Sequence, residues 1–233
     1  VELRGRCEAK RPDFWLLGEI VHGDYTRLAN AETLHSVTNY ECYKGLYSSH
    51  NDGNYFEIAH SLGRQFEDPG IYRDFLPYNF ADNHDVDRIA SSLSTRTHLY
   101  PLYILLFGMP GIPSVYYGSE WGIEGARTGD SDVELRPTMQ DVIGRAERDD
   151  TLYDLISRLA ALHKQQRALH LGSYRKLHVD HKQLAFLRSH EGERAVVAVN
   201  ASEEEVALEL PMPTQEGVYR DVLNGTGDRH VVD

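Results

Sequence analysis

Residues 76–85 read Leu76-Pro-Tyr-Asn-Phe-Ala-Asp-Asn-His-Asp85, a largely apolar stretch that runs directly into four polar side chains. A short apolar run of this kind is typical of a buried strand in a parallel sheet. In parallel β/α barrels the carboxyl ends of the strands form the active site. Residues 82–85 therefore mark a place where chemistry is expected.

The sequence on either side repeats this pattern and alternates it with helical spacing. Further short apolar runs predict strands over residues 14–21, 34–38 and 113–117. Apolar residues at helical spacing predict helices over residues 54–66, 95–107 and 151–169. This alternation indicates an α/β architecture with a parallel sheet.

The pattern changes after residue 169. Short alternating runs joined by Gly, Asn or charged turns predict antiparallel strands over residues 172–179, 184–188, 195–200 and 206–210. We therefore predict a boundary near 169–172, with one domain over residues 1–170 and a second over residues 171–233. The polar, aperiodic stretch 122–148 is predicted to be a long loop.

Composition excludes several classes of function. The formal net charge of −12, with no Lys/Arg cluster, argues against a nucleic-acid partner. The only cysteines, Cys7 and Cys42, have no metal-ligand spacing, so we expect no metal, no cofactor and no disulfide framework. Two free thiols suit a reducing cytoplasm, where we expect the protein. The longest apolar run, residues 99–109, is too short to cross a bilayer, so we expect no membrane partner.

Two carboxylates stand at predicted strand ends. Glu19 follows the apolar run that begins at Phe14, and Asp85 follows the strand within residues 76–85. A pair of carboxylates beside one histidine, His84, without a metal-ligand pattern, indicates acid–base or glycosidic chemistry.

Three motifs resemble the α-amylase family, glycoside hydrolase family 13. Gly18-Glu19 with His22 is similar to the motif of the fifth barrel strand, and Phe80-Ala-Asp-Asn-His-Asp85 to the F-x-x-N-H-D motif of the seventh. Residues 111–120 are similar to the eighth-strand motif. The motifs occur in the family's order. Residues 31–60, with Ser36-Val-Thr-Asn-Tyr40 and Tyr43-Lys-Gly45, resemble the neopullulanase and cyclomaltodextrinase branch, although Val21 stands where many relatives have Trp.

The resemblance implies retaining hydrolysis of α-glucosidic bonds in an α-glucan oligosaccharide such as a maltodextrin. Glu19 would protonate the leaving oxygen and later activate water, and Asp85 would hold sugar hydroxyls as the ring gains positive charge. The remaining residues at these motifs would bind substrate: His84, His22, Asn83, Arg88 and Tyr117.

The family's nucleophile, an Asp in a G-x-R-x-D motif on the fourth strand, has no counterpart in this sequence. The resemblance implies the second half (strands five to eight) of a TIM-type (β/α)8 barrel, followed by a small, truncated antiparallel β-sandwich. We expect such a fragment to be inactive alone. Because half a barrel leaves sheet edges uncovered, we also expect a homo-oligomer, a domain-swapped assembly or a companion chain.

Structural roles are the alternatives at each position. Glu19 could form a salt bridge at a strand end, Asp85 could cap the following helix, and His84 could be structural. Arg88 could serve an ion pair as readily as a substrate. One of Tyr116 and Tyr117 could be a core aromatic.

Two other functions also remain open. One is a non-catalytic, amylase-like domain that binds carbohydrate or partners a transporter, against which the presence of Glu19, His84 and Asp85 argues. The other is a transglycosidase or isomerase of the same family, which the shared motifs do not distinguish from a hydrolase.

Overall fold

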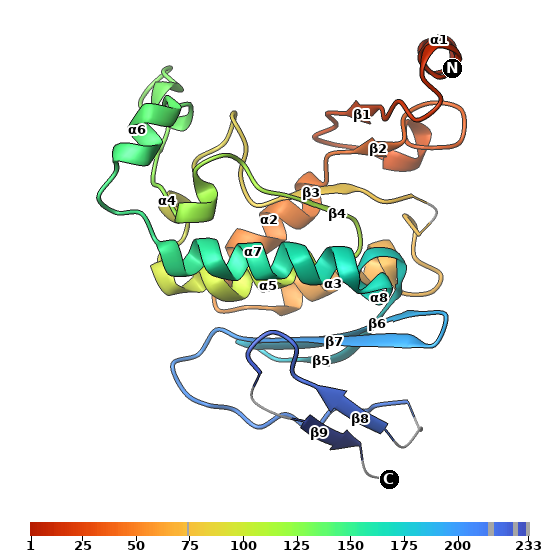
Figure 1. Ribbon diagram of the computed structural model, residues 1–233, viewed down its shortest axis with the longest axis vertical. Coiled ribbons are helices and arrows are strands. Elements are labelled where there is room, and N and C mark those ends of the chain that lie inside the picture. The colour runs from red at the N-terminus through yellow and green to blue at the C-terminus, as the bar shows by residue number, and fades with distance from the viewer. Residues whose placement is uncertain (74, 214–216, 226–227, 232–233) are drawn as a thin grey trace.

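A computed structural model describes residues 1–73, 75–213, 217–225 and 228–231 (Figure 1). Its first layer contains four short strands in chain order: β1 (Leu17–Gly18), β2 (Ser36–Val37), β3 (Tyr78–Phe80) and β4 (Ile112–Ser114). β1 pairs with β2 and β3 with β4, both in parallel. A parallel bridge between Thr38 and Tyr78 joins the two pairs. Each strand overlaps a predicted one, although all four are shorter than predicted.

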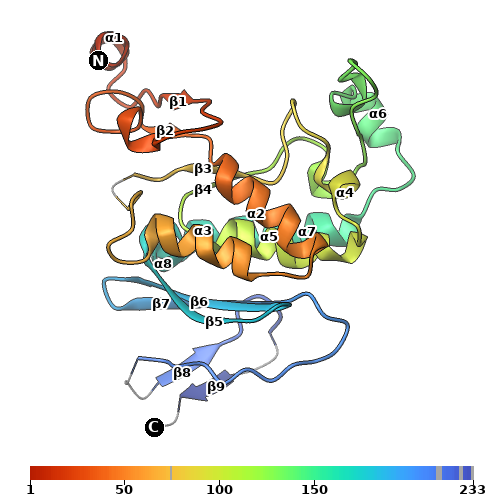
Figure 2. The ribbon, with the colours of Figure 1, turned by 180° about the vertical axis from the view of Figure 1, so that it is seen from behind.

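Helices pack between these strands and a second sheet, as the two opposite views show (Figures 1 and 2). They are α2 (Tyr40–Asn51), α3 (Phe56–Phe66), α5 (Leu99–Gly108), α7 (Asp150–Gln165) and α8 (Arg167–Leu171). The predicted helix over 151–169 is divided at Gln166, whose backbone is extended. α5 is buried on most of its surface because nearly all of its side chains are apolar.

The remaining helical segments are short. They are α1 (Glu2–Lys10), α4 (Ile89–Ser92), α6 (Met139–Gly144) and the 3₁₀ turns η1 (Tyr25–Arg27), η2 (Arg96–His98), η3 (Ser119–Trp121) and η4 (Val133–Leu135). The prediction of an unbroken loop over 122–148 was wrong, since α6 and η4 lie within it. α6 is stabilised by a capping box between Thr138 and Asp141, which needs no apolar periodicity.

The second sheet is antiparallel, in the order β5 (Ser173–Val179), β6 (Gln183–His190), β7 (Glu193–Asn200). β8 (Gly217–Arg220) and β9 (Asp228–Val231) form a separate antiparallel pair. The predicted strand over 206–210 was wrong. Two of its apolar residues, Leu208 and Leu210, pack against residues of β5 and β6 without joining a sheet edge, while Val206 is exposed. The predicted division at residues 170 and 171 stays a prediction.

Arg188 connects the second sheet to the helices. Its buried guanidinium donates hydrogen bonds to the carbonyl oxygens of Gly108 at 2.6 Å and Gly172 at 2.8 Å. Burial lowers the pKa of Arg188 to about 9. Since Gly108 ends α5 and Arg188 lies on β6, one side chain fixes the position of the sheet on the helical layer.

Two edges of the parallel layer are open within the described residues. β1 pairs only with β2, and β4 only with β3. In and around β1, the apolar side chains of Phe14, Trp15, Leu17 and Val21 are exposed. Apolar side chains on an unpaired edge are a surface that another segment or chain can cover. No helix in the described part of the chain is long and apolar enough to cross a membrane.

Candidate active site

The carboxyl ends of β1 and β3 bring the two motif segments to one edge of the parallel layer. Glu19 directly follows β1, and Asn83 follows β3 by three residues. Tyr40, the first residue of α2, lies between them. Its hydroxyl donates to Glu19 Oε1 at 3.0 Å and accepts from Asn83 Nδ2 at 3.1 Å. Sequence analysis assigned no role to Tyr40, because only the fold places its hydroxyl beside Glu19.

Asn83 also sets the position of Asp85. Its Oδ1 accepts the backbone N–H of Asp85 at 2.8 Å, so a single amide contacts both Tyr40 and Asp85. The side chain of Asp85 is 41% exposed and that of His84 is 52% exposed, with His84 Nε2 at 3.3 Å from Asp85 Oδ2. Both side chains are therefore within reach of a ligand, as is the exposed Glu19.

Asp85 has a further partner that sequence analysis missed. Arg136 Nη2 lies 2.8 Å from Asp85 Oδ1 and 2.6 Å from Asp132 Oδ2. Arg136 Nε also donates to the carbonyl oxygen of His84 at 3.1 Å. Asp132 and Arg136 are spaced i, i+4, which is compatible with an ion pair. Nothing in the sequence connects either of them to Asp85. The loop after β4 therefore supplies a cation to the candidate site.

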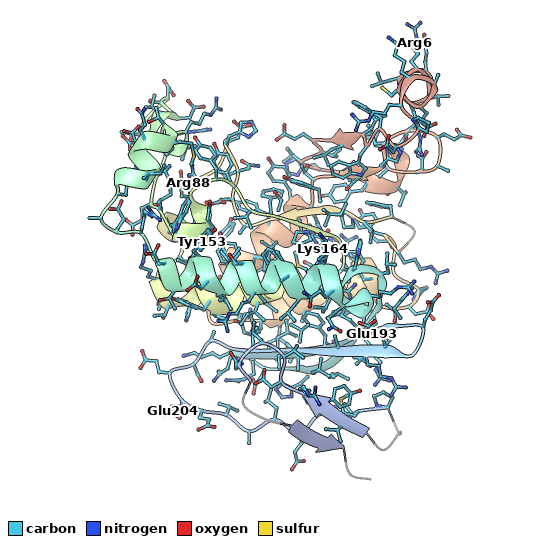
Figure 3. All side chains as sticks on the ribbon, viewed as in Figure 1. Arg6, Arg88, Tyr153, Lys164, Glu193 and Glu204 are labelled. Atoms are coloured by element: carbon cyan, nitrogen blue, oxygen red, sulfur yellow. The ribbon has the colours of Figure 1, made fainter. Side chains whose placement is uncertain are left out.

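The prediction that Arg88 binds substrate does not fit its position. Arg88 is fully buried, and Figure 3 labels it near α4. Its guanidinium donates to the carbonyl oxygens of Tyr117 at 2.6 Å and Leu135 at 2.8 Å, and to Ser119 Oγ at 3.1 Å. It also stacks 4.1 Å from the centre of the Tyr116 ring. Arg88 thus has a structural role, which it performs through hydrogen bonds and ring stacking.

Tyr117 is half-buried, and its hydroxyl donates to the carbonyl oxygen of Pro137 at 2.6 Å. Its ring centre lies 4.7 Å from that of Tyr116. The hydroxyl is therefore engaged with the loop after β4. A sugar contact by Tyr117 stays a prediction.

The buried carboxylate at the end of β3 is Asp82. Its Oδ2 accepts the N–H of Ile89, at the start of α4, at 2.8 Å and the hydroxyl of Ser119 at 2.7 Å. Burial raises the pKa of Asp82 to about 6, against the opposing effect of these hydrogen bonds and of Arg88. Asp82 thus caps the start of α4.

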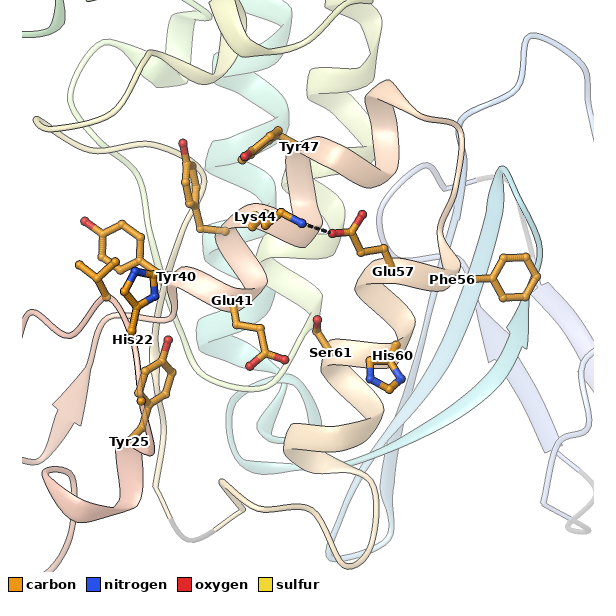
Figure 4. A pocket seen from close by; sticks show the side chains of 13 residues that line it. His22, Tyr25, Tyr40, Glu41, Lys44, Tyr47, Phe56, Glu57, His60 and Ser61 are labelled. Atoms are coloured by element: carbon orange, nitrogen blue, oxygen red, sulfur yellow. Dashed lines mark hydrogen bonds and ion pairs between the residues drawn. The ribbon is translucent and has the colours of Figure 1, made fainter.

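His22 lies on a groove of about 840 Å³ that also reaches Tyr40, α2 and α3 (Figure 4). The groove is walled by aromatic rings and by ion-paired carboxylates. Lys44 Nζ lies 2.9 Å from Glu57 Oε1, and Glu41 pairs with Arg64. Because Tyr40 both lines the groove and binds Glu19, the groove opens beside the candidate acid. Nowhere in the described ranges do three or more His, Cys, Asp or Glu side chains gather as a metal site.

Two family models match the sequence. The model described as "Alpha amylase, catalytic domain" matches residues 2–152, and "Maltogenic Amylase, C-terminal domain" matches residues 174–227. The first covers the parallel layer and the helices from α1 to α6, and the second covers the antiparallel sheet and β8.

Individual proteins with α-glucan-related names also match this sequence. A cyclomaltodextrinase of Geobacillus thermopakistaniensis is 28% identical over 91% of this chain and 35% of its own length. A cyclomaltodextrin glucanotransferase of Niallia circulans is 31% identical over 63% of this chain and 20% of its own length. The chain thus spans about a third or less of these relatives.

Among solved structures, an α-amylase of Geobacillus thermoleovorans complexed with acarbose superposes with a TM-score of 0.81 at 20% identity, over 99% of this chain and 54% of that one. This likeness shows the fold alone. It identifies the parallel layer as derived from a TIM-type barrel, with a sheet domain at its carboxyl end.

Proposed function

Since the chain belongs to the α-amylase family, whose catalytic-domain model matches residues 2–152, we propose that it is part of a retaining hydrolase of maltodextrin-type α-glucans. The order of the three motifs supports assigning β1 to β4 to the fifth to eighth strands of the barrel. In this proposal the chain supplies two of the three carboxylates that the reaction requires.

Glu19 is the proposed general acid and base. It protonates the oxygen of the leaving sugar and then removes a proton from the attacking water. Asp85 accepts hydrogen bonds from sugar hydroxyls and stabilises positive charge on the ring, and His84 donates a further bond. The observation that carries this proposal is the hydrogen-bonded path Glu19–Tyr40–Asn83–Asp85, which joins two exposed carboxylates at one edge of the layer.

Acarbose is a suitable probe for this site, because the α-amylase of Geobacillus thermoleovorans was solved with it. We expect acarbose to bind this chain in a calorimetric titration. Asp85→Ala should weaken binding by about tenfold or more, equivalent to the loss of a hydrogen bond to a charged group. Asp154→Asn, an exposed change on α7, is the matched control and should leave the affinity unchanged. Equal affinity in all three proteins would argue against the assignment.

The chain alone should not turn over substrate. A reaction that retains the anomeric configuration needs a carboxylate nucleophile about 5 Å from the acid. In the family this nucleophile lies in a G-x-R-x-D motif, and the 233 residues contain no such motif. We therefore expect no release of chromophore from a chromogenic maltoside above a Glu19→Gln control. Turnover above that control would show that another carboxylate of this chain serves as nucleophile.

A transglycosidase is the second candidate, because the glucanotransferase of Niallia circulans matches 63% of this chain. A non-catalytic binding role is the third. The gene sequence upstream of Val1 distinguishes the third candidate from the enzymes, since an intact G-x-R-x-D motif supports catalysis and a substituted Asp supports binding. Products formed by the complete enzyme from a labelled acceptor sugar distinguish hydrolysis from transfer.

We also propose a cytoplasmic location. Cys7 and Cys42 are both free thiols, and burial raises the pKa of Cys42 well above its usual range, which suits an inert buried thiol. Fractionation of the producing cells tests this, and recovery of the protein from the medium would contradict it.

A further inference from the structure

Tyr40 has a rigid ring and a hydroxyl that connects two strand ends. The ring meets Phe80 of β3 edge-on at 4.9 Å between centres and Tyr43 of α2 edge-on at 5.9 Å. Aromatic packing of this kind fixes a ring in the plane that its neighbours allow. The position of the hydroxyl is thus set by the core of the protein, independently of Glu19.

Glu19, by contrast, has little to hold it. It follows a strand that ends at Gly18, it is exposed, and its hydrogen bond among the described residues comes from Tyr40. An exposed glutamate samples several rotamers in water, and ordering it costs conformational entropy. A general acid must nevertheless keep its proton aimed at one oxygen atom, since small misplacements reduce the rate strongly.

We propose that Tyr40 is the positioning residue of this site: its hydroxyl holds the side chain of Glu19 in one rotamer and couples it, through Asn83, to the segment that carries Asp85. This inference rests on the proposed function, because it assumes that Glu19 is the acid. It adds a residue from α2 to a site otherwise built from the ends of β1 and β3.

The phenolic hydroxyl of Tyr40 can hydrogen-bond to Glu19 both when Glu19 is a carboxylate and when it is protonated. A phenolic hydroxyl both donates and accepts. Asn83 donates to the oxygen of Tyr40, and Tyr40 donates to Glu19: to a carboxylate oxygen when Glu19 is ionised, and to the carbonyl oxygen when it is protonated, which leaves the acid proton on the other oxygen free to face the leaving sugar. Burial, opposed by the Asn83 bond and reinforced by the Glu19 bond, raises the pKa of Tyr40. The hydroxyl therefore keeps its proton at neutral pH.

Replacing Tyr40 by Phe separates the role of its hydroxyl from that of its ring. Tyr40→Phe removes the hydroxyl and keeps the ring contacts with Phe80 and Tyr43. Tyr43→Phe is the matched control, because it removes a hydroxyl from the same helix. Tyr43 stacks on Phe80 with ring centres 5.1 Å apart, and that contact survives the change.

The test is the rotamer distribution of Glu19 in the isotope-labelled chain at pH 7, measured from side-chain three-bond couplings by NMR. We expect one dominant rotamer in the wild type and in Tyr43→Phe, and averaged couplings in Tyr40→Phe. The Tyr40 Cζ resonance should also move in Glu19→Gln and stay in place in Glu41→Gln.

Averaged couplings in the wild type, or unchanged couplings in Tyr40→Phe, would overturn the proposal. No sugar is present in this experiment, so its failure concerns Tyr40 alone. Failure of the acarbose titration would instead concern the function of the site.

Discussion

Among single residues, Arg88 and Asp82 are two buried polar side chains that lie directly beneath the candidate site. Ser119 Oγ bonds to both of them, at 3.1 Å from Arg88 and 2.7 Å from Asp82. Asp82 in turn holds the first N–H of α4, and Arg88 holds carbonyl oxygens of the segments after β4. The segment 83–85, which carries the proposed chemistry, thus lies between two residues, Asp82 and Arg88, whose side chains are buried and hydrogen-bonded.

Replacing Arg88 by Met should therefore destabilise the chain substantially. The change leaves buried carbonyl oxygens without donors and removes the cation beside Asp82, so we expect a loss of about 3 kcal/mol in the free energy of unfolding. Urea denaturation at pH 7 measures this. Arg158→Met is the matched control, because Arg158 is exposed and donates one hydrogen bond to Leu223. Equal stability of the two variants would contradict the buried role of Arg88.

The candidate carboxylates could be predicted from the sequence, whereas their partners could not. Glu19 and Asp85 stand at strand ends, a position that apolar runs reveal. Tyr40 and Arg136 act through contacts across 21 and 51 positions of sequence, which only the fold creates. For Arg88 the sequence left a substrate contact and a structural role equally open, because its neighbours in sequence do not show that its side chain points into the protein.

At the scale of elements, α2 shows why helices at such a site escape sequence analysis. Its buried face includes Cys42, Gly45, Leu46, Ser49 and His50, only some of which are apolar. The polar members are buried because they have specific partners. Ser49 Oγ accepts the N–H of Ile58 at 3.1 Å, for example, which fixes α2 against α3. Apolar periodicity therefore located α3 and α5 but not α2.

His50 provides a pH test of the contact between α2 and α3. Its Nδ1 donates to the carbonyl oxygen of Leu46 at 2.6 Å, and its Nε2 lies 2.9 Å from the Tyr55 hydroxyl, which leaves Nε2 as the acceptor of the neutral ring. Burial lowers the pKa of His50 from its ordinary value of 6.5 to about 4. The native state thus binds fewer protons than the unfolded state between these values, so stability is lost as pH falls from about 6.5 to about 4.

Between pH 6.5 and pH 4, His50 should lower the free energy of unfolding by up to about 3 kcal/mol. His163, whose pKa burial also lowers to about 4, should contribute a further part of the decrease. We expect His50→Gln to reduce the pH dependence of the free energy of unfolding, measured by urea denaturation at pH 7 and pH 4. His60→Gln, an exposed change on α3, should leave the dependence unaltered. An unchanged slope in His50→Gln would refute the assignment.

At the scale of the whole molecule, the parallel layer has strand edges that no other described strand covers. β1 and β4 each have one unpaired edge within the described residues, and apolar side chains beside β1 are exposed. Covering such a surface is favourable by roughly 25 cal/mol for each Å² of apolar area removed from water. We therefore expect the purified chain to form a homo-oligomer, through either docking or domain exchange.

Sedimentation velocity measures this directly. A species heavier than the 26.5 kDa monomer is expected, and the double change Trp15→Lys with Leu17→Lys should shift it toward monomer by placing charge on the exposed edge. Val133→Lys, at an exposed apolar residue of η4, is the control for added charge. A well-folded, monodisperse wild-type monomer would contradict the expectation.

In the proposed function, a sugar binds where the ends of β1 and β3 meet. The most direct test is a titration of the ¹⁵N-labelled chain with maltotriose, followed through its backbone and side-chain amide resonances. We expect the largest shifts on Glu19, Tyr40 and residues 83–85, and no response from residues of α7. Shifts confined to the antiparallel sheet, or none at saturating maltotriose, would contradict it.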